Sequence, residues 1–344
     1  MEKKLARLFK GKVVMVTGGT GSIGSQIVSK LLTYPVRQVR VFSRDEHKQF
    51  MLQQQYRHLP AGKVSFLIGD IRDRDRVFLA MEGVDIVFNA AAMKHVPMCE
   101  YNPFEAIKTN VLGSENLVDA ARRENVDIYV HVSTDKAAMP INVMGATKLL
   151  AEKIALSANH YRGNRVTRYC AVRFGNVIGS RGSVVPLFLE QIKRGGPVTL
   201  TDPAMTRFML SIPQAVDLVL KSALLTKGEE LFILKMPVVK IGDLTRAMIE
   251  VLAPRFGHDP KNIEIKISGR REGEKVYETL LNEEEAEKVF ENAEMFCIAK
   301  KSLSGFSSSK LKQYRSDKVA CLKYPAVVDL MREICEADLK EVWK

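Results

Sequence analysis

The amino-acid sequence predicts a doubly wound α/β fold, with a Rossmann-type parallel sheet and a smaller C-terminal domain. Six apolar, β-branched runs alternate with longer segments of helical spacing, a pattern typical of parallel strands that are covered on both faces. The runs lie at 12–18, 38–44, 64–70, 85–92, 127–134 and 166–174. The first run leads directly into a glycine-rich turn. After Asn176 the alternation gives way to segments rich in glycine, proline and arginine, so the sheet comes first and the smaller domain second.

Helical spacing is clearest in three segments between the strands. They read SQIVSKLL, EAIKTNVLGSENLVDAARREN and TKLLAEKIALSANHY. A helix over 212–226 and a strand over 231–234 are expected to return to the main sheet, and the final segment, AVVDLMREICEADLKEVW, predicts an amphipathic helix. We therefore expect a first domain over 1–178, with return elements near 212–235, and a second domain over 179–344.

The composition is that of a cytoplasmic globular protein. The 344 residues are 46% hydrophobic and 27% charged, and no apolar run approaches the roughly 18–20 residues that span a bilayer. The five cysteines are scattered, and neither they nor the six histidines have metal-ligand spacing, so we expect a reduced protein without a metal. The basic start is interpreted as leading into the first strand and not as a signal peptide.

The net charge of +12 is compatible with a solvated basic surface or with a basic cleft for phosphate-bearing ligands. Nucleic acid is not an expected partner, because no stretch interleaves aromatic with basic residues as nucleic-acid-binding modules do.

The turn TGGTGSIG, residues 17–24, predicts a dinucleotide site. Its glycines would let the backbone turn sharply and approach a pyrophosphate, and the N-terminus of the following helix would present free amides to the anion. Its position between the first strand and a helix makes the motif specific. The expected cofactor contacts in this turn are Gly18, Thr20, Gly21, Ser22, Ile23 and Gly24.

The end of the second strand favours NADP over NAD. An NAD enzyme usually holds the ribose hydroxyls with a carboxylate at this point. Here Ser43 and Arg44 offer a hydroxyl and a guanidinium, with Lys48 one turn further, and an arginine binds a phosphate with two charge-assisted hydrogen bonds. Asp45 and Glu46 could oppose this preference, although both also suit the first turn of a helix.

Two further strand ends complete the expected cofactor site. Asp70 and Ile71 close the third strand and are expected to flank the adenine. The fourth strand ends in NAAA, and the small side chains of Ala90, Ala91 and Ala92 would let the nicotinamide half lie close. Small residues of the core are the alternative explanation for these alanines.

With these pieces in order, the chain resembles the extended short-chain dehydrogenase/reductase superfamily, and within it the nucleotide-sugar 4,6-dehydratases of the capsule and polysaccharide biosynthesis group. The resemblance covers roughly residues 10–285. It rests on the motifs TGGTGSIG, FSRDEHKQ, GDIRD, NAAAMKHVP, STDKAAMPINVMGATK, FGNVIGSRGSVVPLF, DPAMTRFM and GRREGEKVYETLL. It implies an NADP-dependent enzyme that acts on a UDP-sugar and forms a homo-oligomer, often a hexamer. Within this group the chain resembles the inverting UDP-N-acetylglucosamine 4,6-dehydratases, which also act as 5-epimerases.

Residues 133–148, STDKAAMPINVMGATK, are the expected catalytic segment. Where the superfamily carries a tyrosine this chain has Met144, so the motif reads Met-x-x-x-Lys and ends at Lys148. A thioether cannot take a proton from an alcohol, so Asp135 and Lys136 must carry more of the proton chemistry. By resemblance, Lys136 is the base at sugar carbon 5, Asp135 is the acid that assists loss of water, and Thr134 orients the sugar.

The protonation states of this segment do not follow from the sequence. A lysine whose ordinary pKa is near 10.4 needs a fall of about 3 to act as a base at neutral pH, which burial and neighbouring positive charge can supply. Lys148 is expected to contribute that charge and also to contact the cofactor. An aspartate beside two lysines is normally ionised, so the group titrates as a coupled set. Met144 is expected to fill a gap beside sugar or nicotinamide, and the 4-hydroxyl would give its proton to a water or to the lysines.

The resemblance also implies a set of substrate contacts. Asn176 matches a diphosphate contact, Arg207 and Arg271 match cationic clamps, and Glu274 matches a ribose contact. Structural salt bridges are the alternative for either arginine, and an internally satisfied histidine is the alternative for His95. The remaining expected substrate contacts are Lys94 and His95 near the sugar, with Arg181, Val184 and Thr199.

Three functions stay open on the sequence. The first is a UDP-N-acetylglucosamine 4,6-dehydratase with 5-epimerase activity. The second is a dehydratase that retains the configuration at carbon 5, or a nucleotide-sugar 4-epimerase. The third is a non-catalytic NADP-binding protein. The Asp135–Lys136 pair favours dehydration, because a simple 4-epimerase needs no acid and base for carbons 5 and 6.

Overall fold

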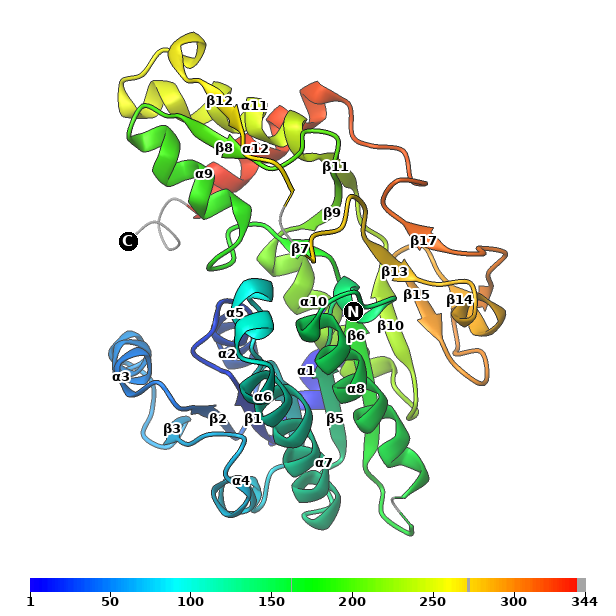
Figure 1. Cartoon of the computed structure of the whole chain (residues 1–344). Coiled ribbons are helices and arrows are strands. Elements are labelled where there is room, and N and C mark those ends of the chain that lie inside the picture. Colours follow the sequence, from blue (N-terminus) through cyan, green and yellow to red (C-terminus); the bar gives the residue numbers. More distant parts are fainter. Residues whose placement is uncertain (162, 271–272, 339–344) are drawn as a thin grey trace. The chain divides into compact units, whose positions relative to one another are not determined.

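The computed structural model describes residues 1–161, 163–270 and 273–338, with side chains up to 334. The chain forms two compact units (Figure 1). Unit 1 comprises Met1–Arg173, Pro213–Lys235 and Asn282–Lys312, and unit 2 comprises Phe174–Ile212, Met236–Leu281 and Gln313–Lys344. Within the described residues, no helix is both long and apolar enough to cross a membrane.

Unit 1 is built on a ten-stranded sheet with the order β16-β14-β15-β10-β6-β5-β4-β1-β2-β3. The strands from β3 to β10 are parallel, and β15, β14 and β16 are antiparallel additions. The predicted doubly wound α/β fold is therefore confirmed. The strands are β1 Val13–Thr17, β2 Gln38–Ser43, β3 Val64–Ile68, β4 Ile86–Asn89, β5 Ile128–Val132, β6 Arg168–Arg173, β10 Leu231–Leu234, β14 Val289–Glu291, β15 Met295–Ile298 and β16 Ser307–Ser308.

Helices cover both faces of this sheet, which explains why β1 is buried at every residue. On one face, apolar residues of α4, α7 and α8 pack with Val13 and Met15 of β1. On the other, Phe9 of α1 meets Phe88 of β4 with ring centroids 6.3 Å apart. The helices are α1 Glu2–Phe9, α2 Ser22–Leu32, α3 Glu46–Gln55, α4 Arg74–Met81, α5 Val96–Tyr101, α6 Pro103–Ala106, η1 Ile107–Leu112, α7 Gly113–Arg123, η2 Asp135–Ala137, α8 Val143–Ser157, η3 Ala158–His160, α10 Ile212–Leu225 and η6 Glu285–Lys288.

The expected first strand forms as β1, and the basic start that leads into it forms helix α1, whose Leu5 and Phe9 are buried. One feature of unit 1 differs from the sequence prediction. Residues 282–312, which the sequence assigned to the second domain, belong to unit 1. The physical reason is backbone hydrogen bonding, because β15 pairs antiparallel with β10. In this register Leu231 lies opposite Ile298 and Leu234 lies opposite Met295.

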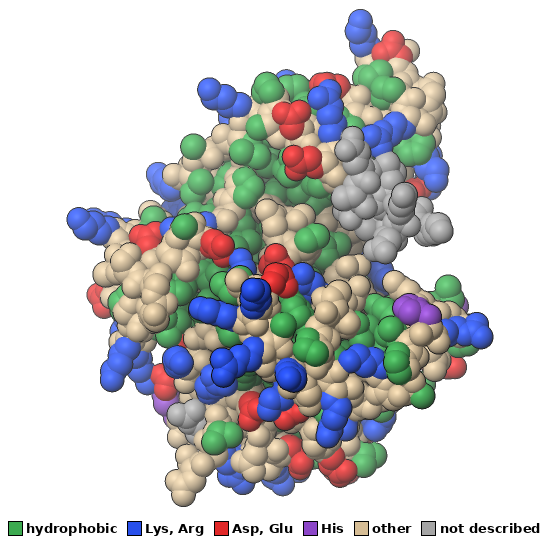
Figure 2. Space-filling model, turned by 180° about the vertical axis from the view of Figure 1, so that it is seen from behind, with side chains coloured by type: hydrophobic (Ala, Val, Ile, Leu, Met, Phe, Trp, Pro, Cys, Tyr) green, Lys and Arg blue, Asp and Glu red, His purple; other side chains and the backbone are tan. Residues whose placement is uncertain are grey.

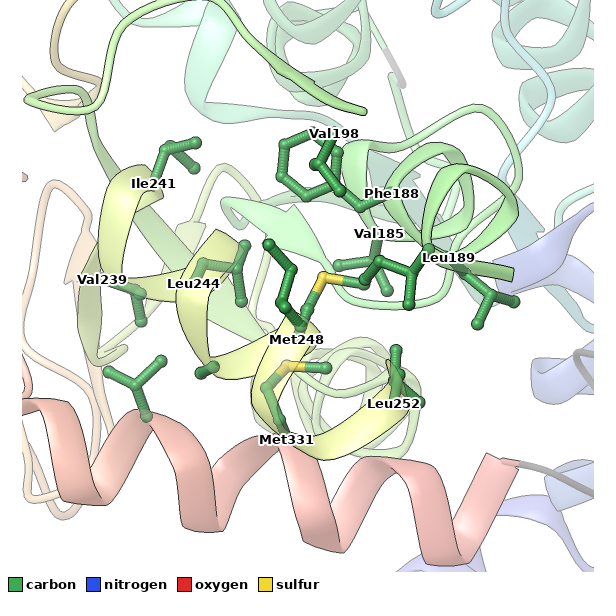
Figure 3. Packing of buried hydrophobic residues seen from close by; sticks show 14 of the residues in the cluster. Val185, Phe188, Leu189, Val198, Val239, Ile241, Leu244, Met248, Leu252 and Met331 are labelled. Carbon is green, nitrogen blue, oxygen red and sulfur yellow. The ribbon is translucent and has the colours of Figure 1, made fainter. Parts of the chain in front are cut away.

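Unit 2 has three small sheets and a helical core. The sheets are β11-β9-β7, β12-β8 and β13-β17. Figure 3 shows the core, in which side chains of α9 (Val185, Phe188), α11 (Met248) and α12 (Met331) point toward one another. The elements are β7 Asn176–Val177, α9 Val184–Lys193, β8 Val198–Leu200, β9 Thr206–Leu210, β11 Val238–Lys240, α11 Ile241–Leu252, η4 Ala253–Phe256, η5 Pro260–Asn262, β12 Ile265–Ile267, β13 Thr279–Leu281, β17 Tyr314–Arg315 and α12 Tyr324–Asp338.

Basic side chains do not gather into one block on the face shown in Figure 2. Lysines and arginines are dispersed over it with acidic side chains between them. That face therefore has the character of a solvated basic surface, one of the two interpretations of the net charge of +12.

Candidate active site

The turn after β1 is packed too tightly for a side chain at two of its glycines. Gly18 has a φ of +63°, and a Cβ at this residue would lie 2.8 Å from the carbonyl oxygen of Ala90. A Cβ on Gly24 would lie 2.2 Å from the carbonyl oxygen of Gly18. Helix α2 begins next to this turn with Gly21 as its N-cap. Because glycine has no side chain, no side-chain hydrogen bond caps the helix. Bare backbone beside a helix N-terminus fits the pyrophosphate of a dinucleotide.

The end of β2 places a hydroxyl pair and an arginine beside this turn. The Thr20 and Ser43 hydroxyl oxygens are 2.8 Å apart. The Arg44 side chain is 60% exposed, and its guanidinium lies 3.6 Å from the Asp70 carboxylate. Asp45 caps α3 by accepting a hydrogen bond from the Lys48 amide and pairs with the Lys48 ammonium. Of these two cations, Arg44 has the more exposed side chain, at 60% against 47% for Lys48.

The two residues expected to flank the adenine have different surroundings. The Asp70 carboxylate accepts two hydrogen bonds from the Arg72 guanidinium, at 2.9 and 2.7 Å. The Ile71 side chain is buried in the core against α4 and α7, and it occupies the space that a Cβ on Gly113 would need. Any contact of Ile71 with a cofactor would thus come from its backbone.

Thr134, Asp135 and Lys136 form one hydrogen-bonded group at the end of β5. The Asp135 carboxylate is almost wholly buried, at 1% exposure, whereas the Lys136 side chain is 26% exposed. Asp135 Oδ1 accepts hydrogen bonds from Thr134 Oγ1 at 2.7 Å and from Lys136 Nζ at 3.0 Å. The structure therefore brings together the three residues that the sequence nominated for proton transfer.

Helix α8 packs directly against this group. A Cβ on Gly145 would lie 2.5 Å from the carbonyl oxygen of Lys136, so the glycine sets the distance between α8 and η2. Met144, in the tyrosine position, is buried in a small apolar cluster with Cys99 and Ala106. Its surroundings are hydrocarbon and thiol, with Met93 also packed against them. The sequence did not single out Gly145, although a glycine inside a helical pattern is a signal of close approach.

Lys148 lies on the inner side of α8, facing β5. Its Nζ donates a hydrogen bond to the carbonyl oxygen of Val132 at 2.6 Å and lies 3.3 Å from His131 Nε2. Burial lowers the pKa of Lys148 to about 8. Burial also holds the pKa of His131 well below its ordinary value.

A buried polar network that the sequence analysis missed continues from His131 across the sheet. Asn89 stands opposite His131 in the β4–β5 register, and its Nδ2 lies 3.2 Å from His131 Nδ1. The same amide contacts Thr17 at 2.7 Å and Tyr129 at 2.9 Å. The available signal was the presence of polar residues at the ends of otherwise apolar strands.

The segment after β4 carries the remaining expected residues of unit 1. Ala90 and Ala91 are partly buried, whereas Ala92, Lys94 and His95 are exposed. His95 is the N-cap residue of α5. Burial, with the nearby charge of Lys94, lowers the pKa of His95.

The expected substrate residues of unit 2 have contacts of several kinds. Asn176 Oδ1 is buried and has no hydrogen-bond partner in the described part of the chain. Thr199 exchanges two hydrogen bonds with the side chain of Gln191, and Val184 packs against the core. Glu274 Oε1 accepts from Thr201 Oγ1 at 3.4 Å, and Arg181 is exposed. Arg271 lies outside the described residues.

Arg207 holds a chain segment in place within unit 2. Its guanidinium donates to the carbonyl oxygens of Lys275 at 2.7 Å and Val276 at 3.2 Å. The side chain is buried and lies 3.6 Å from the Glu278 carboxylate. These contacts match the structural alternative for this arginine, and its role as a clamp on substrate stays a prediction.

A family model described as polysaccharide biosynthesis protein matches residues 14–300. The chain belongs to this family. The resemblance to the extended short-chain dehydrogenase/reductases is therefore confirmed.

Several relatives of this family align over most of the chain. A protein of Methanocaldococcus jannaschii, named as an uncharacterized membrane protein, is 50% identical over 97% of this chain and 99% of its own length. The inverting UDP-N-acetylglucosamine 4,6-dehydratase of Campylobacter jejuni is 41% identical over 85% of this chain and 84% of its own. A UDP-glucose 4-epimerase of Rickettsia typhi is 44% identical over 82% and 81%. The X-ray structure of Pen from Bacillus thuringiensis superposes with a TM-score of 0.89 at 44% identity, covering 94% of this chain and 98% of that one.

Proposed function

We propose that this chain is an NADP-dependent UDP-N-acetylglucosamine 4,6-dehydratase with 5-epimerase activity, a lyase that is redox-neutral overall. The observation that carries the proposal is the pairing of the Asp135 carboxylate with the Lys136 ammonium at 3.0 Å, with the Thr134 hydroxyl on the same oxygen. The similarity to the Campylobacter jejuni enzyme supports it over most of the chain. A product of this kind, a 4-keto-6-deoxy sugar nucleotide, would serve the synthesis of surface polysaccharide.

The glycine cradle after β1 and the α2 N-terminus would hold the pyrophosphate of NADP, and Lys148 would face its nicotinamide half. NADP bound there would supply the redox chemistry, the removal of a hydride from sugar carbon 4 and its later return to carbon 6. Between these events the 4-keto group acidifies the hydrogen on carbon 5, and the 6-hydroxyl leaves as water. The chain's residues must therefore remove one proton and supply another.

One proton transfer inside the Asp135–Lys136 pair would prepare Lys136 to act as a base and Asp135 to act as an acid. Moving a proton from the ammonium to the carboxylate across 3.0 Å gives a neutral amine and a carboxylic acid without changing the net charge. The amine can then take the proton from carbon 5, and the acid can protonate the departing 6-hydroxyl. Thr134, which donates to Asp135, keeps the carboxyl group oriented and lies next to the sugar site that the proposal requires.

The preference for NADP rests on the end of β2. Arg44 is exposed beside Ser43, whereas the carboxylate of Asp45 is turned into the cap of α3 and the pair with Lys48. In unit 2 we assign the UDP half of the substrate to residues that include Asn176, whose buried Oδ1 is available to a donor. A reduced cytoplasmic location and a homo-oligomeric state are part of the same proposal.

Incubation of the purified protein with UDP-N-acetylglucosamine in heavy water tests this function. We expect an NMR spectrum of a 4-keto-6-deoxy product with deuterium at carbon 5 and inverted configuration there. Retained configuration at carbon 5 would reassign the enzyme to the retaining dehydratases. Absence of both exchange and water loss, in protein shown to be folded, would remove the proposal.

A 4-epimerase is the second candidate, because the Rickettsia typhi relative carries that name at 44% identity. An epimerase would convert UDP-glucose or UDP-N-acetylglucosamine to the galacto isomer without deuterium at carbon 5. The same NMR experiment therefore separates the two activities.

A further inference from the structure

A chain of buried polar groups crosses unit 1 from β4 through β5 to α8. Asn89, His131 and Lys148 are each almost inaccessible to solvent, so every hydrogen on them must point at a protein acceptor. The contacts run from Asn89 Nδ2 to His131 Nδ1 at 3.2 Å and from His131 Nε2 to Lys148 Nζ at 3.3 Å. The direction in which these hydrogens point decides the charge of Lys148.

The backbone fixes the first link. The Ala91 amide lies 3.3 Å from Asn89 Oδ1, and a backbone N–H can only donate. The atom that faces it must therefore be the amide oxygen, which also accepts from the Thr17 hydroxyl at 2.7 Å. The Asn89 amide is thus anchored with its nitrogen toward Tyr129 at 2.9 Å and His131 at 3.2 Å, and Ser114 Oγ lies further away at 3.5 Å. The two hydrogens on Nδ2 are assigned to the two nearer acceptors.

The second link follows from the chemistry of a neutral imidazole, which has one protonated and one bare nitrogen. Asn89 Nδ2 donates, so His131 Nδ1 must accept and is bare. The ring proton is then on Nε2, which faces Lys148 Nζ. An ammonium has no lone pair to accept that hydrogen, whereas a neutral amine has one and can still donate to the Val132 carbonyl oxygen at 2.6 Å.

We propose that the hydrogen-bond chain from Ala91 through Asn89 and His131 holds Lys148 as a neutral amine, and that this amine is the proton acceptor for the sugar 4-hydroxyl in place of the missing tyrosine. The second part of this proposal, that Lys148 accepts the proton, rests on the proposed function. In the step, Lys148 Nζ first turns its single lone pair from the His131 Nε2 hydrogen toward the 4-hydroxyl. The O–H bond of the 4-hydroxyl then breaks and an N–H bond forms on Lys148, and the hydrogen bond from His131 is restored when Lys148 later gives up the proton. The electron pair of the carbon 4–hydrogen bond leaves as hydride to an oxidised nicotinamide, so the sugar is oxidised and the cofactor reduced.

Several charged groups on the elements packed around α8 are themselves paired. The charge of Glu152 raises the pKa of Lys148 and so opposes the neutral form, while burial lowers that pKa and is the larger effect. Glu152, one turn along α8 from Lys148, is held by the buried Arg173 of β6 at 2.6 Å. Glu100 of α5 accepts from the Val143 amide at 2.6 Å. The other pairs are Asp135–Lys136 of η2, Glu105–Lys108 of α6 and η1, Asp119–Arg122 of α7, and His160–Glu229 at η3.

Nitrogen-15 NMR of histidine-labelled wild-type protein at pH 8.5 tests the chain without substrate or cofactor. We expect His131, assigned from the signal that His131→Gln removes, to have a bare Nδ1 and a protonated Nε2. A proton on Nδ1, or an imidazolium, would overturn the inference even in an enzyme that dehydrates UDP-N-acetylglucosamine. Conversely, the expected tautomer in a protein that leaves that substrate untouched would retain the hydrogen-bond chain and discard the second part of the proposal together with the proposed function.

The pH profile supplies a second test. In His131→Gln the amide can turn its oxygen toward Lys148 and accept from an ammonium, so the acidic limb of kcat/KM should move to higher pH by roughly one pH unit. The matched control is His160→Gln, at an exposed histidine on η3, which should leave the limb where it is. An unmoved limb in His131→Gln, with turnover and folding retained, would show that Lys148 is not the acceptor.

Discussion

The ammonium of Lys136 lies 3.0 Å from Oδ1 of its chain neighbour Asp135, and the carboxylate it contacts is almost wholly buried. Neighbouring residues on an extended strand point to opposite faces, so they cannot make this contact. The 3₁₀ turn η2 removes that constraint by starting at Asp135. The local backbone, rather than a distant partner, therefore creates the acid and base of the proposed reaction.

Replacing Lys136 should abolish turnover far more completely than replacing Met144. We expect Lys136→Ala to lose at least about 100-fold in kcat, the usual contribution of a general base, while Met144→Ala keeps measurable activity. Product formation from UDP-N-acetylglucosamine, followed by NMR, measures both. Met144 is buried, and its truncation should cost about 2–5 kcal/mol of unfolding free energy, so thermal unfolding must accompany the assay. Lys3→Ala, at an exposed lysine of α1, is the control, and complete loss in both test variants would contradict this division of roles.

Arg44→Ala should change the choice of nucleotide. A charge-assisted hydrogen bond contributes about 1.5–3 kcal/mol, so the Kd for NADP should rise roughly 10- to 100-fold while the Kd for NAD changes little. Calorimetric titration with both nucleotides measures the ratio. Arg37→Ala, at an exposed arginine before the start of β2, is the matched control. An unaltered ratio of affinities would show that Arg44 does not contact the 2′-phosphate.

Gly18→Ala and Gly11→Ala separate close packing from backbone strain. Both glycines have positive φ, +63° and +71°, so alanine at either should lose about 1–2 kcal/mol of stability. Gly11 has no atom within 4 Å of the added Cβ, whereas at Gly18 the carbonyl oxygen of Ala90 lies 2.8 Å away. Urea unfolding should show the larger loss for Gly18→Ala, and only this variant should also lose the rise in Tm that NADP produces. Equal losses of stability would mean that the turn relaxes around the methyl group.

The stability of the wild type relative to Lys148→Met should depend on pH. Burial lowers the pKa of Lys148 from 10.5 to about 8, so between these values the unfolded chain binds a proton that the folded chain has released. The free energy of unfolding of the wild type should therefore rise with pH in this window, by roughly 3 kcal/mol in total, relative to the variant. Denaturant unfolding of both proteins from pH 7 to 10.5 measures the difference between their free energies of unfolding. The contributions of other titrating groups cancel in this difference. A difference independent of pH would show that Lys148 keeps an ordinary pKa.

Local patterns were sufficient to predict those parts of the molecule in which neighbours in sequence decide the structure. The strand expected at 231–234 forms as Leu231–Leu234, and the glycine turn lies between β1 and α2. Thr134, Asp135 and Lys136 meet because they are consecutive. Each of these features depends on alternation, glycine chemistry or a single turn, which a sequence displays directly.

Contacts between distant strands were not predictable in the same way. His131 looks like an interruption of an apolar run, and only the β4–β5 register places it opposite Asn89. Arg207 was expected to clamp substrate or to form a structural salt bridge, and the sequence did not show that carbonyl oxygens of Lys275 and Val276 accept hydrogen bonds from it. Residues 282–312 carried no compositional mark of the sheet that they join. In each case the partner lies tens of residues away, and no periodicity encodes it.

Arg173 at the end of β6 has a bearing on how the protein is made. Its guanidinium is wholly buried between Glu152 and Glu285, and Glu285 follows it by 112 positions. During synthesis the ribosome releases the whole of the intervening polypeptide before that second carboxylate can reach the arginine. A nascent chain that stops short of residue 282 thus has one of the two carboxylates that hold Arg173, and its β10 has no antiparallel neighbour. Unit 1 therefore matures late in translation, although most of its residues are the first to emerge.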